Sequence, residues 1–195
     1  MYEKFIDFIN NNYNGIITSK EAEKKGIARV YLKKMTDEGF IERIEHGIYA
    51  TDKFIFDEYY VFQLKHPNAI FSYNTSLYLQ NMTERTPNKM DITTKRNTNL
   101  SSYKYKINLY RVNDDIVNLG KCKIKTNYGN IVNAYNLERT VCDVINNKST
   151  IDIETANKSI RKCIKSKQFD VNKMFDYAIK MKIYDKVKSY MEAII

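Results

Sequence analysis

The positively charged side chains between residues 18 and 46 are those whose types and spacing suggest a chemistry. Arg29, Lys33 and Lys34 fall within one short segment that also has the apolar spacing of a helix. An arginine guanidinium can bind O6 and N7 of guanine together, whereas a lysine ammonium binds phosphate as a compact charge. These residues therefore predict a DNA-binding segment in which Arg29 reads a base while Lys33 and Lys34 contact phosphates.

Further residues would complete such an interface. If Leu32 and Met35 are buried, Val30 and Tyr31 stay available beside Arg29. A predicted helix N-terminus, where backbone N–H groups favour a phosphate, and a predicted hairpin add five candidates: Thr18, Ser19, Lys20, Arg43 and His46. Any of these side chains could instead belong to a solvated surface. Nearby acids would repel phosphate unless they point away from DNA: Asp37, Glu38, Glu42 and Glu45.

Local signals predict the elements that must hold these residues. A first amphipathic helix is indicated by four apolar residues at helical spacing: Tyr2, Phe5, Ile6 and Ile9. Thr18 with Glu21 has the pattern of a capping box, so a second helix should begin there and end at Gly26. A third helix is expected over about 28–38, closed by Gly39.

Two strands should follow the third helix, over 40–44 and 47–50, with a tight turn at residues 45–47 between them. Helix, short helix, glycine turn, helix and hairpin together predict a winged helix-turn-helix over 1–52. The alternative is another kind of small α+β domain.

The chain beyond residue 53 has a different pattern. Helices are expected over 54–64, from residue 74 or 75 to about 82, and over 137–145, with two or three more at the end; strands are expected over 69–73, 103–109 and 121–126. The sequence therefore predicts an α+β protein, with a mixed α/β domain over 53–195 that ends in helices. The boundary after residue 52 rests on the change of pattern.

The net charge of +9 is unevenly distributed along the chain. Residues 1–50 hold eight basic and eight acidic side chains, so the excess lies further on. Lysines alternate with apolar residues on two predicted strands, which would form one positive sheet face if those strands are neighbours: Lys104, Lys106, Lys121, Lys123 and Lys125. A positive stripe is predicted opposite the apolar face of a late helix: Lys158, Arg161, Lys162 and Lys165. The alternative for that stripe is the solvated side of an amphipathic helix.

Enzymatic and metal-binding patterns are scarce. There are only six glycines, two histidines and three widely spaced cysteines, with no glycine-rich phosphate loop. Two acid–lysine pairs could belong to a nuclease-like active site, but their spacing is loose: Asp91 with Lys95, and Glu23 with Lys25. We therefore expect no enzymatic activity, no cofactor and no metal. Buried reduced cysteines, an acid-bearing N-terminus and the lack of long apolar runs favour a cytoplasmic protein.

The segments Gly15–Ala22, Gly26–Ile27, Gly39–Arg43 and Gly47–Tyr49 resemble the opening of AbiEi-type antitoxins, which are abortive-infection regulators of bacterial toxin–antitoxin systems. The later segment Tyr135–Asp143 resembles a signature of the same family. Ala28 departs from the pattern, because a small polar capping residue is usual there.

The resemblance implies an antitoxin that represses its own promoter by binding inverted repeats. It also implies that the C-terminal domain counters a nucleotidyltransferase-like toxin, without the need for a stable complex, as in type IV systems. Two other readings stay open. One is a winged-helix regulator without a toxin partner, whose second domain senses a ligand or dimerises. The other is an enzyme, such as a nuclease, with an appended DNA-binding domain.

Overall fold

The structure, a computed structural model, describes residues 2–98, 100, 106–147 and 151–194. Contacts divide the chain into two compact units, Met1–Pro67 (unit 1) and Asn68–Ile195 (unit 2). Unit 1 extends beyond residue 52 because helix α4 (Glu58–Lys65) packs through Val61 against the small sheet of that unit. Asp57 caps this helix, since its carboxylate accepts hydrogen bonds from two backbone N–H groups of the first turn.

Unit 1 otherwise follows the predicted order. It contains α1 (Tyr2–Tyr13), β1 (Ile16–Thr18), α2 (Ser19–Lys24), α3 (Arg29–Asp37), β2 (Glu42–Glu45) and β3 (Ile48–Ala50). The three strands form an antiparallel sheet in the order β1-β3-β2. The helices and the sheet share one core: Phe5, Ile9, Ile17, Ala22, Leu32, Met35 and Ile41. Strand β1 was not predicted, because Ile16 and Ile17 are too short a run to have a period.

Unit 2 is built on a mixed five-stranded sheet. Its elements are β4 (Ile70–Phe71), α5 (Tyr73–Leu79), β5 (Met90–Lys95), β6 (Ile107–Val112), β7 (Lys121–Lys125), β8 (Ile131–Tyr135), α6 (Leu137–Asn146), α7 (Ile153–Ile164), α8 (Val171–Lys180) and α9 (Tyr184–Ile194). The strand order is β6-β5-β4-β8-β7, with β5–β6 and β4–β8 parallel and the other pairs antiparallel. The predicted α+β class is therefore confirmed.

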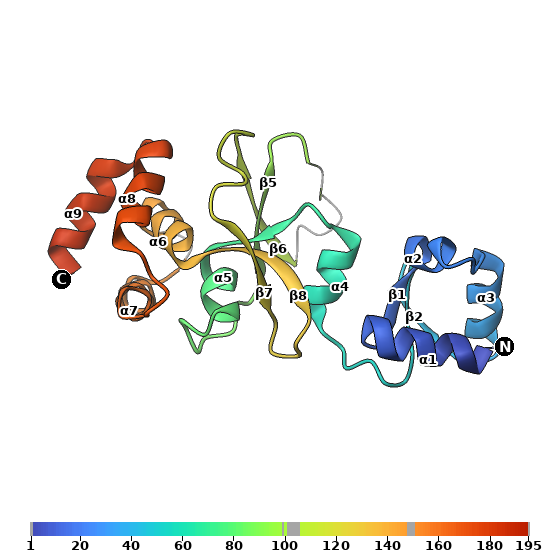
Figure 1. Ribbon diagram of the computed structural model, residues 1–195. Coiled ribbons are helices and arrows are strands. Elements are labelled where there is room, and N and C mark those ends of the chain that lie inside the picture. Colours follow the sequence, from blue (N-terminus) through green and yellow to red (C-terminus); the bar gives the residue numbers. More distant parts are fainter. Residues whose placement is uncertain (1, 99, 101–105, 148–150, 195) are drawn as a thin grey trace. The chain divides into compact units, whose positions relative to one another are not determined.

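Helix α6 lies at the centre of the helical layer of unit 2. Helices α6 to α9 gather on one side of the sheet, and α5 lies between α6 and the sheet (Figure 1). Every residue from Leu137 to Ile145 is buried, so α6 packs on all sides. The core around α6 takes apolar residues from each neighbouring helix, for example Leu77, Ile160, Met174 and Val187.

The buried polar side chains of α6 join this helix to the β6–β7 connection. The Arg139 guanidinium donates from Nε to Asp143 Oδ1 at 3.0 Å and from Nη1 to the carbonyls of Ile116 and Leu119 at 2.8 and 3.0 Å. It also lies over the Tyr135 ring, 4.3 Å from the centroid. Burial raises the pKa of Asp143 to about 6 even though Arg139 opposes that shift. The segment Tyr135–Asp143, which resembles the family signature, therefore contributes buried contacts that hold α6 in unit 2.

No helix in the described part of the chain is both long enough and apolar enough to cross a lipid bilayer.

Candidate nucleic-acid interface

Helices α2 and α3 form a helix-turn-helix joined by residues 25–28. The predicted capping box is present, because Thr18 Oγ1 accepts from Glu21 N at 3.2 Å and Glu21 Oε2 accepts from Thr18 N at 2.9 Å. Gly26 has a φ of +82°, and the next residue donates back to the Ala22 carbonyl at 3.0 Å, which closes α2. As predicted, Ala28 stands at the N-cap of α3 and makes no side-chain capping bond.

Helix α3 presents the predicted face to solvent. Leu32 and Met35 are buried in the core of unit 1, which fixes the rotation of the helix. The five residues predicted to remain available are all exposed: Arg29, Val30, Tyr31, Lys33 and Lys34. Val30 is 68% exposed and Tyr31 is 49% exposed, although both are apolar enough to be buried elsewhere. Apolar groups next to cations suit a surface that meets base edges and thymine methyl groups.

Two cations of α3 have acidic partners. Arg29 Nε lies 2.6 Å from Glu23 Oε1 of α2, and Lys34 Nζ lies 3.8 Å from Glu38 Oε1 one turn later. Lys33 makes no ion pair with any described residue. The Arg29–Glu23 pair was not predicted, because it spans the turn between two helices and therefore has no helical spacing. Both partners are exposed, so Arg29 can leave Glu23 at little cost.

The hairpin β2–β3 forms the predicted wing. Arg43 Nη2 and His46 Nδ1 are 2.7 Å apart and both side chains are exposed. Glu45 points to Lys65 of α4, with 2.6 Å between Nζ and Oε2, so this acid is partly neutralised. Asp37, Glu38 and the remaining wing acid Glu42 are exposed.

The wing turn is attached to the start of α2. Ser19 N donates to the Gly47 carbonyl at 2.8 Å and Ser19 Oγ to the same oxygen at 3.3 Å. Ser19 is buried and the Thr18 hydroxyl belongs to the capping box, so both hydroxyls already have partners inside unit 1. Of the three candidates at this helix start, Lys20 alone is exposed.

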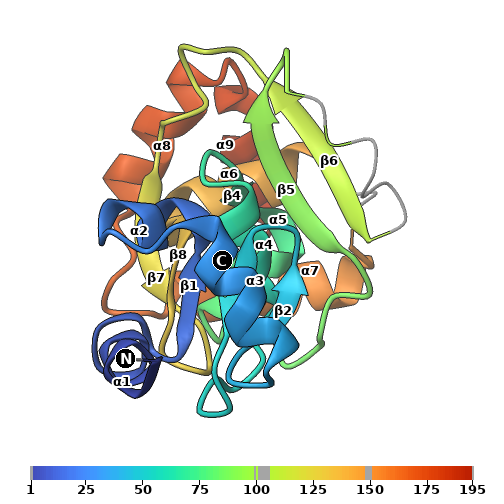
Figure 2. The same ribbon diagram turned by 90° about the vertical axis from the view of Figure 1, so that its right-hand side faces the viewer.

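The lysines that were predicted on two strands of unit 2 do not form one positive face of the sheet. Strands β6 and β7 lie at opposite edges of the five-stranded sheet (Figure 2), because β6 pairs with β5 whereas β7 forms a hairpin with β8. Lys106 is exposed beside one edge, and Lys104 lies outside the described residues. The lysines of β7 are exposed at the other edge: Lys121, Lys123 and Lys125.

The predicted stripe on α7 is present. Ala156, Ile160 and Cys163 are buried on one side of this helix. The four predicted cations are all exposed, and none makes an ion pair with a described residue: Lys158, Arg161, Lys162 and Lys165.

The two loose nuclease-like sets are not assembled. Asp91 is 2% exposed, whereas Lys95 is paired with Asp114 at 3.0 Å between Nζ and Oδ2. Glu23 is paired with Arg29 rather than with Lys25. Within the described residues, no group of three or more histidine, cysteine or acidic side chains is placed to hold a metal ion.

Comparisons with known proteins concern the family of the N-terminal residues and the fold of the chain. Residues 5–51, which run from α1 to the end of the wing, match the family described as "transcriptional regulator, AbiEi antitoxin". The predicted resemblance is therefore confirmed for that part of the chain. The fold is similar to that in the crystal structure of the RV2827C protein from Mycobacterium tuberculosis, with a TM-score of 0.52 and 8% identity, over 95% of this chain and 76% of that one. No curated protein matches this chain in sequence.

Proposed function

We propose that this protein is an autorepressing antitoxin that binds inverted repeats in its own promoter and counters a nucleotidyltransferase-like toxin. The observation that carries the DNA-binding part is the exposed face of α3, where Arg29, Val30 and Tyr31 stand beside Lys33 above a buried Leu32. The antitoxin part rests on the family match of residues 5–51.

In this proposal α3 enters the major groove and its N-terminal end faces the bases. Arg29 exchanges Glu23 for a guanine, because Glu23 holds Nε, one of the guanidinium donors that a bidentate contact can use. Lys20, Lys33 and Lys34 contact phosphates, and Arg43 with His46 contacts the backbone or minor groove at the wing. The α7 stripe adds phosphate contacts or serves the action against the toxin.

The test is a titration of the full chain with labelled DNA from its own upstream region and with scrambled DNA, at two salt concentrations. We expect tight binding to the upstream DNA and weaker, steeply salt-dependent binding to the scrambled DNA. Arg29→Ala should cost about 1–3 kcal/mol on the upstream DNA and relax preference at one base position. The matched control is Arg96→Ala, an exposed arginine of unit 2. Equal weakening of Arg29→Ala on both DNAs would remove Arg29 from base reading.

The toxin partner needs a separate test. Expression of this chain should restore the growth of cells that express a nucleotidyltransferase-like toxin gene from the same operon. The Arg29→Ala variant should restore growth as well if DNA reading and toxin neutralisation are separate. Lack of rescue by the unsubstituted chain would instead favour a winged-helix regulator without a toxin partner.

A further inference from the structure

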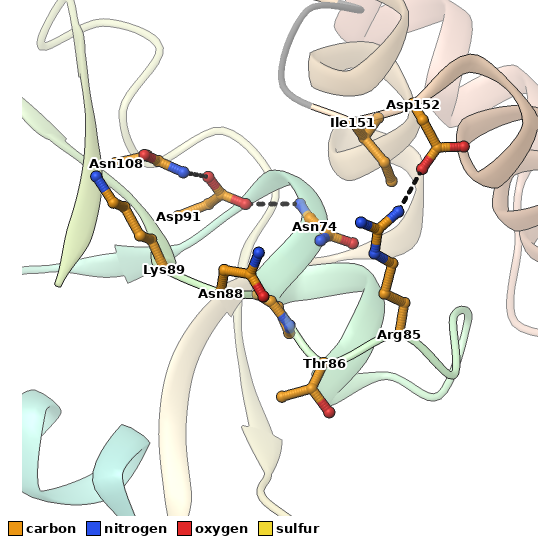
Figure 3. Close-up of a pocket in the computed structure, with 10 residues that line it drawn as sticks. Asn74, Arg85, Thr86, Asn88, Lys89, Asp91, Asn108, Ile151 and Asp152 are labelled. Carbon is orange, nitrogen blue, oxygen red and sulfur yellow. Dashed lines mark hydrogen bonds and ion pairs between the residues drawn. The ribbon is translucent and has the colours of Figure 1, made fainter.

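Unit 2 contains a polar pocket that has no part in the proposed DNA interface. The cavity has a volume of about 300 Å³ and lies among the start of α5, residues 85–89, strands β5 and β6 and the start of α7. Its polar lining includes Asn74, Arg85, Asn88, Lys89, Asp91 and Asn108 (Figure 3).

One wall of this pocket is already fixed by internal hydrogen bonds. The Asp91 carboxylate accepts from Asn108 Nδ2 at 2.9 Å, from the Tyr110 hydroxyl at 3.2 Å and from the backbone N of Asn74 at 3.2 Å. The backbone N of Asp91 in turn donates to Thr75 Oγ1 at 2.8 Å. These bonds join α5, β5 and β6, so a ligand would meet a preorganised surface and would not have to order it.

Other groups in the pocket are left with unused capacity. Asn74 Oδ1 is buried and accepts no hydrogen bond from a described residue, which leaves a desolvated acceptor. The Lys89 ammonium makes no ion pair with a described residue. Arg85 is already paired with Asp152 through Nη1 at 2.8 Å, but both side chains are exposed, so an incoming anion can displace this carboxylate at little cost.

The order of these groups limits what can satisfy them together. Figure 3 shows Lys89 and Arg85 on opposite sides of Asn74 and Asn88. A ligand that meets all of them needs an anionic group for one cation, a hydrogen-bond donor for Asn74 Oδ1 and acceptors at the far end.

We propose that this pocket binds a nucleoside monophosphate, with the phosphate on Arg85, a ribose hydroxyl donating to Asn74 and the base edge on Asn88 and Lys89. Arginine suits the phosphate because its planar donors form parallel bonds to two oxygens. A carboxamide suits a base edge because it offers a donor and an acceptor side by side. The volume lies at the small end of the range for ligand pockets, which fits one nucleotide better than a longer chain.

The experiment is calorimetric titration of the full chain, without DNA, with AMP, GMP, CMP and UMP. The corresponding nucleosides and inorganic phosphate are the comparison ligands. At least one nucleotide should bind, and its nucleoside and inorganic phosphate should each bind about tenfold more weakly or worse. Inorganic phosphate binding as tightly as the nucleotide, or no binding of any nucleotide, overturns the proposal.

Three variants assign the ends of the ligand. Arg85→Ala should lower nucleotide affinity to that of the nucleoside, because the phosphate loses its partner. Lys89→Ala should weaken nucleotide and nucleoside alike, and Asn74→Ala should weaken both about tenfold. The control Lys123→Ala removes the same charge from β7 and should leave binding unchanged. Lys89 is exposed and lies outside the proposed DNA interface, so Lys89→Ala should fold and retain promoter binding. Unchanged nucleotide affinity in Arg85→Ala and Lys89→Ala overturns the assignment.

Discussion

The exposed face of α3 and the exposed face of α7 are both basic, yet they differ in what surrounds the cations. On α3, Arg29 and Lys34 have acidic partners, and the apolar side chains of Val30 and Tyr31 stand between the charges. On α7 the four cations have no acidic partner among the described residues. A mixed surface can favour one DNA sequence over others, whereas a uniform positive surface attracts any phosphate backbone.

The charge of the whole chain follows the same division. Residues 1–67 hold 10 basic and 11 acidic side chains, and residues 68–195 hold 22 and 12. Unit 1 therefore cannot attract DNA by its net charge, and its affinity must come from where individual groups are placed. Unit 2 can supply long-range attraction without reading a sequence.

The largest expected effect tests whether the two units unfold independently. Arg139→Ala should destabilise unit 2 by about 3–5 kcal/mol, because it leaves Asp143 buried without its partner and removes two bonds to carbonyls. Hydrogen exchange resolved along the chain should show loss of protection in unit 2 and unchanged protection in unit 1. Loss in both units would mean that they unfold together. The same substitution at the exposed Arg161 should change stability by less than about 0.5 kcal/mol.

The pH dependence of that loss has a definite sign. Burial already raises the folded pKa of Asp143 to about 6, above its ordinary value, and loss of Arg139 should raise it further. Stability that depends on a protonated Asp143 is present at low pH and is lost as pH rises through the folded pKa. The destabilisation caused by Arg139→Ala should therefore be larger at pH 8 than at pH 5.

The next effect tests whether the α7 face contacts DNA. Replacing its four cations together by glutamine should lower the salt dependence, the slope of log affinity against log salt, by about 3–4. At 0.1 M salt this corresponds to a loss on the order of 10³–10⁴-fold for every DNA sequence. The ratio between upstream and scrambled DNA should not change. An unchanged slope would assign this face to a different partner or to solvent.

A smaller effect is expected at Lys33, the cation of α3 that makes no ion pair with a described residue. Lys33→Ala should weaken binding to upstream and scrambled DNA by a similar factor, about eightfold at 0.1 M salt, and reduce the slope by about one. A variant with the original slope would place Lys33 outside the interface.

The smallest effect is a gain. Glu23→Gln should tighten binding to upstream DNA by up to about 1 kcal/mol, because Arg29 then has no ion pair to leave and one negative charge near the phosphates is removed. The gain should vanish in the Arg29→Ala background if it acts through Arg29. A gain that persists there would come from the loss of repulsion between Glu23 and the DNA phosphates.

The helix-turn-helix was predictable because its signals are local. The spacing of Leu32 and Met35, the Thr18–Glu21 capping box and the turn at Gly26 each lie within a few residues. The same signals placed the exposed face of α3 correctly. They could not place the hydroxyls of Thr18 and Ser19, because Ser19 turns to the carbonyl of Gly47 in a distant segment.

Unit 2 was less predictable because its buried groups are often polar. In β5, residues 91–94 are all buried, yet Ile92 alone is apolar, so no alternation marks the strand. Arg139 would be expected at the surface, and its carbonyl partners at residues 116 and 119 are set by the fold rather than by spacing. The pocket at Asn74 and Asp91 had no signal for the same reason.

The position of β7 in the sheet gives its lysines a role that requires no nucleic acid. This strand pairs with β8 on one side, and its other side is an edge of the sheet in the described residues. An open edge invites strand addition by another chain, and charged side chains along it discourage that pairing. Replacement of Lys121, Lys123 and Lys125 by apolar residues would then promote aggregation, so reduced activity in such variants should first be compared with their solubility.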